Sequence, residues 1–245
     1  MQIIGILQAR TGSKRYKNKV LKKINNKTIL EIQIDRILRS KLISALVVAT
    51  STSINDKKIY NICKKNNIHC YRGSQKNVLS RFYNIVKLYN PDHVVRLTAD
   101  CPLVDPKIID TIIKSHLKNK NDYTSNIILP TYPDGYDVEV IKKNILVTAY
   151  MNAKSSLDRE HVTSYINSRP KKFKLLNIKN TVDYSYIRLT VDYKEDLILI
   201  RKIFSFFEKK KKFFDFNDVI KFLLKNPKLL NLNNKYARNE GFIKR

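Results

Sequence analysis

The sequence predicts an α/β protein in which helices flank a mainly parallel sheet and a smaller mixed α+β subdomain is attached. Short apolar runs rich in β-branched residues occur at 2–9, 45–50 and 93–100, which is typical of strands buried on both faces. Amphipathic stretches with helical spacing separate these runs. Because strands that alternate with helices favour right-handed crossovers, we expect the strands to lie mainly parallel.

Three helices are expected between and after the early strands. Residues 28–40 place isoleucines near helical spacing, and Thr28 with Glu31 matches a capping box at the helix start. Residues 55–67 and 77–89 repeat the pattern, each with an apolar stripe and a basic face. These helices would cover the sheet.

After residue 121 the pattern changes to short strands and helices in mixed order. Helices are expected at 144–152 and 159–167. We predict a smaller subdomain over about 123–185 that serves acceptor binding or dimerisation, after which "RLTVD" returns to the main sheet. The strand-like stretches are "YTSN", "PDGYDVEVI", "KFKLLNIKN" and "YIRLTVD".

The remainder of the chain divides into a closing helix and a tail. "KEDLILIRKIFSFF" has the apolar spacing of a helix that ends the main domain, which we place at 1–208. Residues 209–245 are rich in lysine and asparagine, with one amphipathic helix near 214–224. This stretch is predicted to be a basic C-terminal helix and tail.

Composition limits the classes of protein to consider. The chain has 245 residues and 43% hydrophobic content, enough for one sizeable core. Its net charge of +27 favours either a polyanionic partner or a uniform compositional bias. Lysine, asparagine and isoleucine are abundant along the whole length, which favours the bias.

The cysteines and the apolar runs indicate the cellular setting. Three cysteines without C-x-x-C spacing predict neither a disulfide framework nor a zinc site. No apolar run approaches the roughly 18 residues that a membrane-spanning helix needs, and the first residues lack a signal-peptide layout. We therefore expect a cytoplasmic protein without a membrane span.

A basic loop follows the first predicted strand. Residues 10–19 contain five cations, and Gly12 and Ser13 would let backbone N–H groups turn toward an anion. Another loop follows the strand that ends near Thr98, and carboxyl ends of parallel strands share one sheet edge. Such a loop suits a nucleoside triphosphate, although a solvated loop in a lysine-rich chain would look similar.

Two aspartates end apolar strand-like runs, Asp100 in "TADCP" and Asp192 in "LTVD". An isolated ionised carboxylate is costly to bury without a partner. Mg²⁺ binds a few carboxylates together with phosphate oxygens, so these two residues are the candidate metal ligands. The alternative for Asp100 is the N-cap of the next helix, for which Asp105 is better placed.

Further polar residues are candidates for acceptor binding. Asp137 and Glu139 stand two apart, so on a strand they would face the same side and orient acceptor hydroxyls, bind a second metal or line a solvated edge. Arg159, Glu160 and His161 stand together at a helix start and suit an anionic acceptor. For His161 the alternative is a helix-cap or core histidine.

Several motifs resemble those of a known family. "QARTGSKRYKNKVL" resembles the N-terminal signature of bacterial cytidylyltransferases that activate sugar acids, most closely the spore-coat polysaccharide biosynthesis branch. The resemblance covers about residues 2–205. The further matches follow in the same order: "YRGSQKNVLSRFY", "VVRLTADCPLVDP", "YPDGYDVEV", "REHVTSYI" and "IRLTVDYKEDL".

The resemblance implies a nucleotide-diphospho-sugar-transferase-like, Rossmann-like fold that uses CTP and Mg²⁺, with a homodimer as the expected assembly. It implies that Arg10 and Lys19 are the catalytic cations. Two departures are the Lys17–Asn18 pair, where the family often has Pro-Gly, and Asn77, where it often has an acid. The residues matched to nucleotide binding are Gln8, Ala9, Arg10, Gly12, Ser13, Lys14, Arg15, Lys19, Arg72, Ser74 and Thr98.

The sequence thus predicts transfer of CMP from CTP to an acidic sugar or related acceptor, with release of pyrophosphate, for surface polysaccharide or glycan biosynthesis. Positioning and charge neutralisation would carry catalysis, and no covalent nucleophile is required. One alternative is a GT-A-like glycosyltransferase that uses a nucleotide-sugar donor, because D-x-E is similar to the metal-binding D-x-D. The other is a basic nucleic-acid-binding module, although no recognisable nucleic-acid motif is present.

Overall fold

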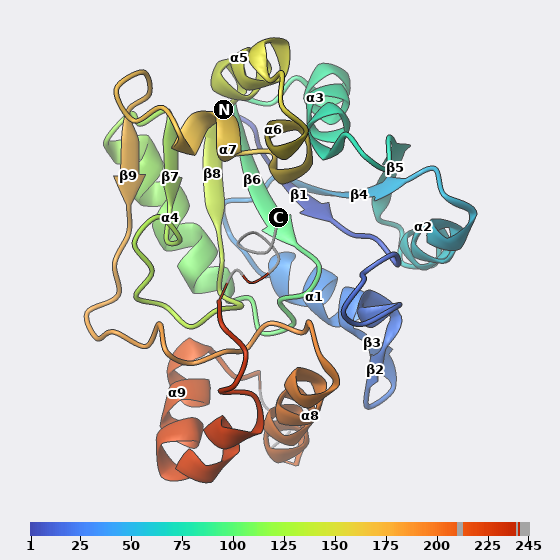
Figure 1. The fold of residues 1–245 in the computed structure, drawn as a ribbon, viewed down its shortest axis with the longest axis vertical. Coiled ribbons are helices and arrows are strands. Elements are labelled where there is room, and N and C mark those ends of the chain that lie inside the picture. Colours follow the sequence, from blue (N-terminus) through green and yellow to red (C-terminus); the bar gives the residue numbers. More distant parts are fainter. Residues whose placement is uncertain (210–212, 239, 241–245) are drawn as a thin grey trace.

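The computed structural model describes residues 1–209, 213–238 and 240. Seven strands form one sheet in the order β5-β4-β1-β6-β8-β7-β9 (Figure 1). Only the pairings of β8 are antiparallel, so the predicted mainly parallel sheet is confirmed. The strands are β1 (Ile3–Gln8), β4 (Ala45–Ser51), β5 (His69–Gly73), β6 (His93–Thr98), β7 (Tyr123–Ser125), β8 (Glu139–Lys142) and β9 (Leu175–Asn177).

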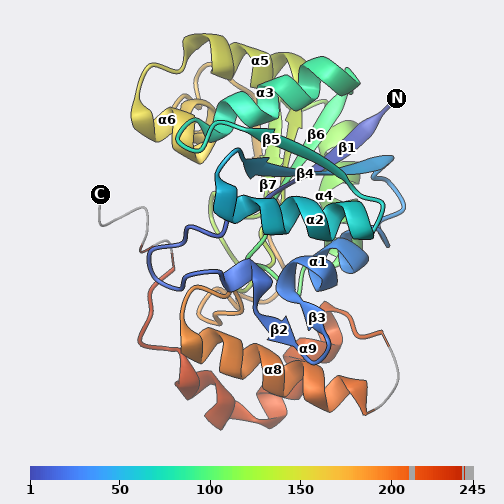
Figure 2. The same ribbon diagram turned by 90° about the vertical axis from the view of Figure 1, so that its right-hand side faces the viewer.

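Helices cover both faces of the sheet (Figure 2). Along β1, Ile3 and Leu7 pack into the core beneath one set of helices, while Ile4 and Ile6 pack beneath the other. This alternation follows from the two-residue period of a strand. The first face carries α1 (Ile29–Ile37), α2 (Lys57–Lys65) and α4 (Pro106–Lys118), and the second carries α3 (Val78–Tyr89), α5 (Lys143–Asn152), α6 (Ser156–His161) and α7 (Ser164–Asn167). On the first side, α8 (Lys194–Glu208) and α9 (Phe216–Lys225) pack into the same core farther from the strands (Figure 2).

Short elements complete the chain. β2 (Lys23–Ile24) and β3 (Lys27–Thr28) pair as a small antiparallel hairpin. Three 3₁₀ helices are present in the described residues: η1 (Lys19–Leu21), η2 (Ile54–Asp56) and η3 (Pro227–Leu232). None of the helices described is both long and apolar enough to cross a membrane.

Side-chain caps explain where several helices begin. Thr28 and Glu31 form the predicted capping box at α1. Asn77 accepts a hydrogen bond from the Ser80 N–H and so caps α3. Asp105 caps α4, with Pro106 at the first helical position. The N-cap alternative for Asp100 is therefore ruled out, because Asp105 holds that place.

Two local predictions were wrong. "RLTVD" does not return to the main sheet: Arg188 forms only an isolated bridge with Asp134, and the backbone N–H of Val191 donates to the carbonyl of Asp100. The single helix expected at 159–167 is divided into α6 and α7 by Val162, whose φ of 59° lies in the left-handed region. From the stretch expected to form a subdomain, β7, β8 and β9 extend the main sheet.

Candidate active site

The loop after β1, the loop after β6 and the extended segment 187–192 meet at the carboxyl edge of the sheet. Their meeting point is Lys19, whose ammonium lies 2.7 Å from Oδ2 of Asp100 and 2.6 Å from Oδ1 of Asp192. The Lys19 residue is only 9% exposed. The structure thus brings one cation predicted to be catalytic between the two predicted metal ligands.

Charge balance holds this cluster together. Burial lowers the pKa of Lys19, but Asp100 and Asp192 outweigh it and raise the pKa above its ordinary value. Burial likewise raises the pKa of Asp100, and the ammonium of Lys19 outweighs that effect and holds the pKa well below its usual range. Lys19 and Asp100 are therefore both charged near neutral pH.

The backbone of the basic loop is fixed at both ends. At its start, the buried Asp56 carboxylate accepts from the N–H of Thr11 at 2.7 Å and from its hydroxyl at 2.6 Å. At its end, the N–H of Asn18 donates to the Thr11 carbonyl at 3.0 Å. Asn18 adopts the left-handed conformation, with φ of 57°, which asparagine tolerates better than most residues. Asn18 thus reaches a conformation that glycine adopts without cost, where the resembling family often has Pro-Gly.

The arginines of this loop diverge. Arg15 lies 2.5 Å from Oδ2 of Asp192 and joins the Lys19 cluster. Arg10, the other predicted catalytic cation, instead points to Glu160 of α6, at 3.7 Å. The loop therefore connects the carboxylates to the predicted acceptor-binding residues.

The other loop residues predicted to bind nucleotide lie along the same turn. Ala9 continues the sheet by donating to the Ala49 carbonyl, and Ser13 donates its N–H to the Thr11 carbonyl. The side chain of Gln8 accepts from Arg96. Gly12 and Lys14 are exposed, and a side chain at Gly12 would meet open space.

Arg72 and Ser74 hold local structure on the next strand edge. Arg72 donates to the carbonyls of Ser51, Thr52 and Ser53. The hydroxyl of Ser74 accepts from the N–H of Asn77, at 3.0 Å. These hydrogen bonds hold the turn and do not involve the Lys19 cluster.

The remaining strand-edge residue predicted to bind nucleotide is Thr98, at the end of β6. Its hydroxyl lies 3.4 Å from Sγ of Cys101. Asp100, a member of the Lys19 cluster, stands between Thr98 and Cys101 in the same turn. Thr98 therefore precedes a residue of the cluster by two positions.

Asp137 and Glu139 have different partners. Glu139 is 2% exposed and pairs with Arg96 while accepting from the hydroxyl of Tyr123 at 2.8 Å. Asp137 pairs with Arg238 at 2.6 Å. Each of these two carboxylates thus has an arginine counter-ion of its own.

The predicted acceptor residues lie on α6. Arg159 donates from Nε to the carbonyl of Ala153 at 3.3 Å. His161 ends the helix and is half-buried. With Glu160 paired to Arg10, this helix faces the basic loop.

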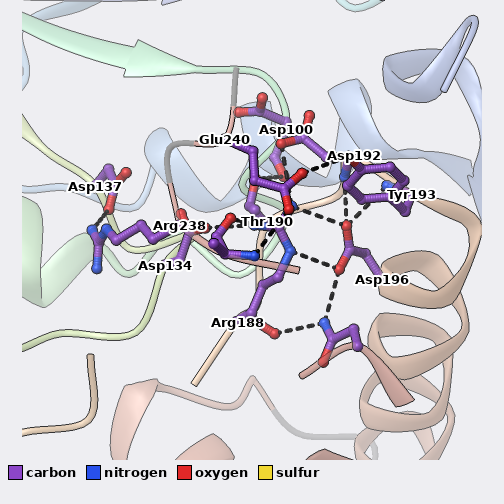
Figure 3. A network of polar contacts seen from close by, with 12 residues as sticks. Asp100, Asp134, Asp137, Arg188, Thr190, Asp192, Tyr193, Asp196, Arg238 and Glu240 are labelled. Carbon is purple, nitrogen blue, oxygen red and sulfur yellow. Dashed lines mark hydrogen bonds and ion pairs between the residues drawn. The ribbon is translucent and has the colours of Figure 1, made fainter. Parts of the chain in front are cut away.

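Arg188 is the centre of a buried network that sequence reasoning missed (Figure 3). Its guanidinium lies 3.0 Å from Asp134, 3.0 Å from Asp196 and 3.3 Å from Asp192. Asp196 also accepts from the N–H groups of Asp192 and Tyr193. The network therefore fixes the backbone and the side chain of Asp192. The only sequence signal for Arg188 was its place in the motif "IRLTVDYKEDL".

Gly135 allows the Asp134 loop to approach this network. Its φ is +110°, and a Cβ there would lie 2.6 to 2.7 Å from backbone atoms of Leu189 and Thr190. Only glycine fits such a conformation and such a close approach. Burial, together with the nearby Asp137 charge, raises the pKa of Asp134 to about 7.

Arg81 of α3 is a second feature that the sequence did not reveal. It is 2% exposed, donates to the Ala49 carbonyl at 3.3 Å, and leaves its Nε without a hydrogen-bond partner. Burial, together with the charge of Arg10, lowers the pKa of Arg81 to about 10. Among the described residues, no acidic side chain forms an ion pair with it.

The donor set at Lys19 fits a magnesium ion in kind. The Lys19 ammonium lies 2.7 Å from Oδ2 of Asp100 and 2.6 Å from Oδ1 of Asp192, so the distance between these two oxygens is at most the sum of those two distances. Mg²⁺ commonly takes one or two carboxylates and completes its shell with substrate phosphates and water. The described residues contain no cluster of three or more acidic, histidine or cysteine side chains that could hold a metal on its own. A cation at this position would thus depend on the substrate for further ligands.

Comparisons with known proteins agree on one family. The family model described as Cytidylyltransferase matches residues 4–233. The chain is 41% identical over 237 residues to the uncharacterised protein MJ1063 of Methanocaldococcus jannaschii, covering 95% of each chain. It is 32% identical over 210 residues to the spore coat polysaccharide biosynthesis protein SpsF of Bacillus subtilis, covering 83% of this chain and 86% of SpsF.

A solved structure has the same fold over nearly the whole chain. The structure of a cytidylyltransferase from Leptospira borgpetersenii superimposes with a TM-score of 0.91 and 32% identity, covering 97% of this chain and all of the other.

Proposed function

The chain belongs to the cytidylyltransferase family, and from this premise we propose that it transfers CMP from CTP to an acidic sugar or a related acceptor. Family membership makes the protein a CTP-dependent nucleotidyltransferase. The proposal adds the acceptor class, the metal and the role of each residue. One observation carries it: Lys19 joins the basic loop to Asp100 and Asp192 in one buried cluster.

In this reaction an acceptor oxygen attacks the α-phosphorus of CTP. The bond from that phosphorus to the oxygen bridging the β-phosphorus breaks, and pyrophosphate leaves with the electron pair. Lys19, Arg15 and Arg10 would neutralise the charge that develops on the leaving group. Because their loop is anchored by Asp56 and closed by Asn18, these charges are held in place before the substrate arrives.

We assign Asp100 and Asp192 to hold Mg²⁺. When bound, the ion would supply charge neutralisation at the phosphate oxygens. Arg188 and Asp196 fix the position of Asp192, and Asp105 relieves Asp100 of any capping role. The carboxylates are therefore preorganised for a cation.

The acceptor side of the proposal rests on α6. Arg10 contacts Glu160 of that helix, so a substrate held by the loop would lie beside Arg159 and His161. Positive charge there suits a carboxylate on the acceptor. The relative SpsF is named for spore coat polysaccharide biosynthesis, which supports a sugar acceptor destined for a surface polysaccharide.

The test is pyrophosphate release from each of the four nucleoside triphosphates with Mg²⁺ and pooled sugar acids. We expect pyrophosphate release with CTP but not with the other three nucleoside triphosphates, and only when the sugar acids are present. Lys19→Ala should lower turnover on the order of a hundredfold, because it removes a preorganised charge. Asp100→Asn and Asp192→Asn should do the same.

Matched controls separate the site from general charge effects. Lys17 is exposed in the same loop and Asp183 is an exposed aspartate, so Lys17→Ala and Asp183→Asn should keep turnover within about twofold. Thermal melts would confirm that each variant is folded. Full activity of folded Lys19→Ala would remove the role given to the cluster, and release of nucleoside diphosphate from a sugar nucleotide would instead indicate a glycosyltransferase.

A further inference from the structure

Residues 233–238, which follow η3, fold back onto the acidic loops of the site (Figure 3). Asn233 is 2% exposed. Its side-chain amide donates to the Arg188 carbonyl at 3.0 Å and to Oδ1 of Asp196 at 2.8 Å. The segment therefore begins as a bound part of the Arg188 network.

The next residues remain in contact with that network. The ring of Tyr236 stacks on Tyr193 with centroids 3.7 Å apart and an interplanar angle of 5°. The carbonyl of Ala237 accepts from Arg188 at 3.3 Å, and the Tyr193 hydroxyl donates to Glu240 at 2.7 Å. Tyr193 directly follows Asp192 in the chain, so these contacts hold the residue next to a proposed metal ligand.

Arg238 carries the segment to the other acidic loop. Its guanidinium lies 2.6 Å from Oδ1 of Asp137 and donates to the Tyr132 carbonyl at 3.0 Å. The two side chains are only 15% and 25% exposed. Burial raises the pKa of Asp137, and Arg238 acts against that rise.

The charge balance of the aspartates around Lys19 and Arg188 depends on Arg238. Asp134 and Asp192 share Arg188, and Asp100 and Asp192 share Lys19. Among the described residues, the ion-pair partner of Asp137 is Arg238. Without that guanidinium, Asp137 would be an unpaired carboxylate close to other carboxylates, a place that attracts a cation.

We propose that Asn233, Tyr236 and Arg238 are part of the active site and that Arg238 is a positioning residue for Asp137. By neutralising this carboxylate, Arg238 prevents Asp137 from joining Asp100 and Asp192 in binding a divalent cation. The metal requirement is then met by two carboxylates and the substrate phosphates. The meaning of this arrangement for catalysis rests on the proposed function, but the charge coupling itself does not.

The test measures Mn²⁺ binding to the full chain without nucleotide, by electron paramagnetic resonance. Arg238→Ala should bind Mn²⁺ more tightly, on the order of fivefold, because one negative charge in the cluster loses its partner. Arg238→Lys keeps the charge and should stay within about twofold of the parent chain. The double variant Arg238→Ala with Asp137→Asn removes both charges and should return to the parent value.

Controls and a second variant keep the outcome decisive. Lys235 of the same segment pairs with Glu195 at an exposed position, so Lys235→Ala should leave Mn²⁺ affinity unchanged. Asp137→Asn alone leaves Arg238 without its partner and should weaken Mn²⁺ binding by a similar factor. If the double variant binds Mn²⁺ severalfold more weakly than the parent chain, Asp137 is itself a ligand and the proposal is wrong.

Activity gives an independent readout. Arg238→Ala should lower pyrophosphate release from CTP. Higher release with unchanged Mn²⁺ affinity would show that the segment obstructs the site, which overturns the positioning role. Failure of the chain to use CTP would refute the proposed function and leave the Mn²⁺ result standing, so the two failures are distinguishable.

Discussion

Lys19 has the most demanding position of any residue in the site. A buried ammonium is stable only where its lost hydration is replaced, and Asp100 and Asp192 both contact it. The same contacts keep two carboxylates together that would otherwise repel. Lys19 thus keeps the pair assembled when no divalent cation is present, and its flexible stem allows it to shift toward a phosphate when one arrives.

Arg81 has the opposite balance, because it is buried without an ion pair in the described part of the chain. A hydrophobic residue of similar volume often replaces a buried charge without loss of stability. We therefore predict that Arg81→Met raises the melting temperature or leaves it unchanged. The same variant should show a smaller melting shift with CTP, because Arg81 and Arg10 repel each other until an anion lies between them.

Arg36 provides the matched control for Arg81. It is also buried, at 4% exposure, but it donates to the carbonyls of Leu103, Val104 and Phe214. Arg36→Met should lower the stability by about 2 to 4 kcal/mol, because buried carbonyls lose their donor. Equal destabilisation by both variants, measured by denaturant unfolding, would contradict the distinction.

At the scale of elements, the site depends on two loops that approach each other closely. The loop after β7 reaches segment 187–192 because Gly135 has no side chain. We predict that Gly135→Ala lowers the free energy of unfolding by about 2 kcal/mol or more, since it combines a positive φ with a backbone clash. It should also abolish activity, because Asp134 and Arg188 would separate.

Gly12→Ala is the control for that prediction. A side chain at Gly12 meets nothing within 4 Å, so the free energy of unfolding should change by less than about 0.5 kcal/mol. Chemical denaturation of the two variants beside the parent chain measures the difference. A similar loss at both positions would show that the contact of Gly135 with segment 187–192 is unimportant.

Over the whole molecule, the sequence predicted best what short-range patterns encode. The apolar runs at 2–9, 45–50 and 93–100 formed β1, β4 and β6 because a short run of β-branched apolar residues is a local signal for a buried strand. Segment 187–192 has the same local pattern, but its partners are the loops at Asp134 and Asp100. No local pattern encodes partners so far apart in the chain.

The candidate site shows the same division. The meeting of Lys19 with Asp100 followed from the rule that the ends of parallel strands share one edge. Asp192 joins them from segment 187–192, which is not a strand of the sheet. Whether Arg10 or Arg15 reaches Asp192 depends on the loop path that Asp56 and Asn18 set. The Arg238–Asp137 pair joins residues 101 positions apart, so only the folded chain reveals it.

The pH dependence of stability combines groups that oppose one another, since burial lowers the pKa of His116 and of its neighbour His93 but raises that of Asp134. Burial and the neighbouring His93 lower the pKa of His116 to about 3, and its ring lies 3.0 Å from Thr124 Oγ1. As pH falls below about 6.5, the unfolded chain takes up a proton that folded His116 refuses, so stability falls. Asp134 acts the other way. Its pKa is raised in the folded chain, so the folded chain takes up a proton at higher pH than the unfolded chain and stability rises as pH falls. The net curve can therefore be shallow, and the contribution of His116 must be measured by difference.

We predict that between pH 7 and pH 5 the parent chain loses about 1 to 2 kcal/mol of unfolding free energy relative to His116→Gln. Asp134 is present in both chains, so its opposing contribution cancels in the comparison. Urea unfolding at several pH values measures the difference, and His69→Gln at an exposed position should follow the parent curve. Parallel curves for the parent and His116→Gln would mean that His116 accepts a proton within the fold, and the His93–His116 pair joining β6 and α4 would then be charged rather than neutral.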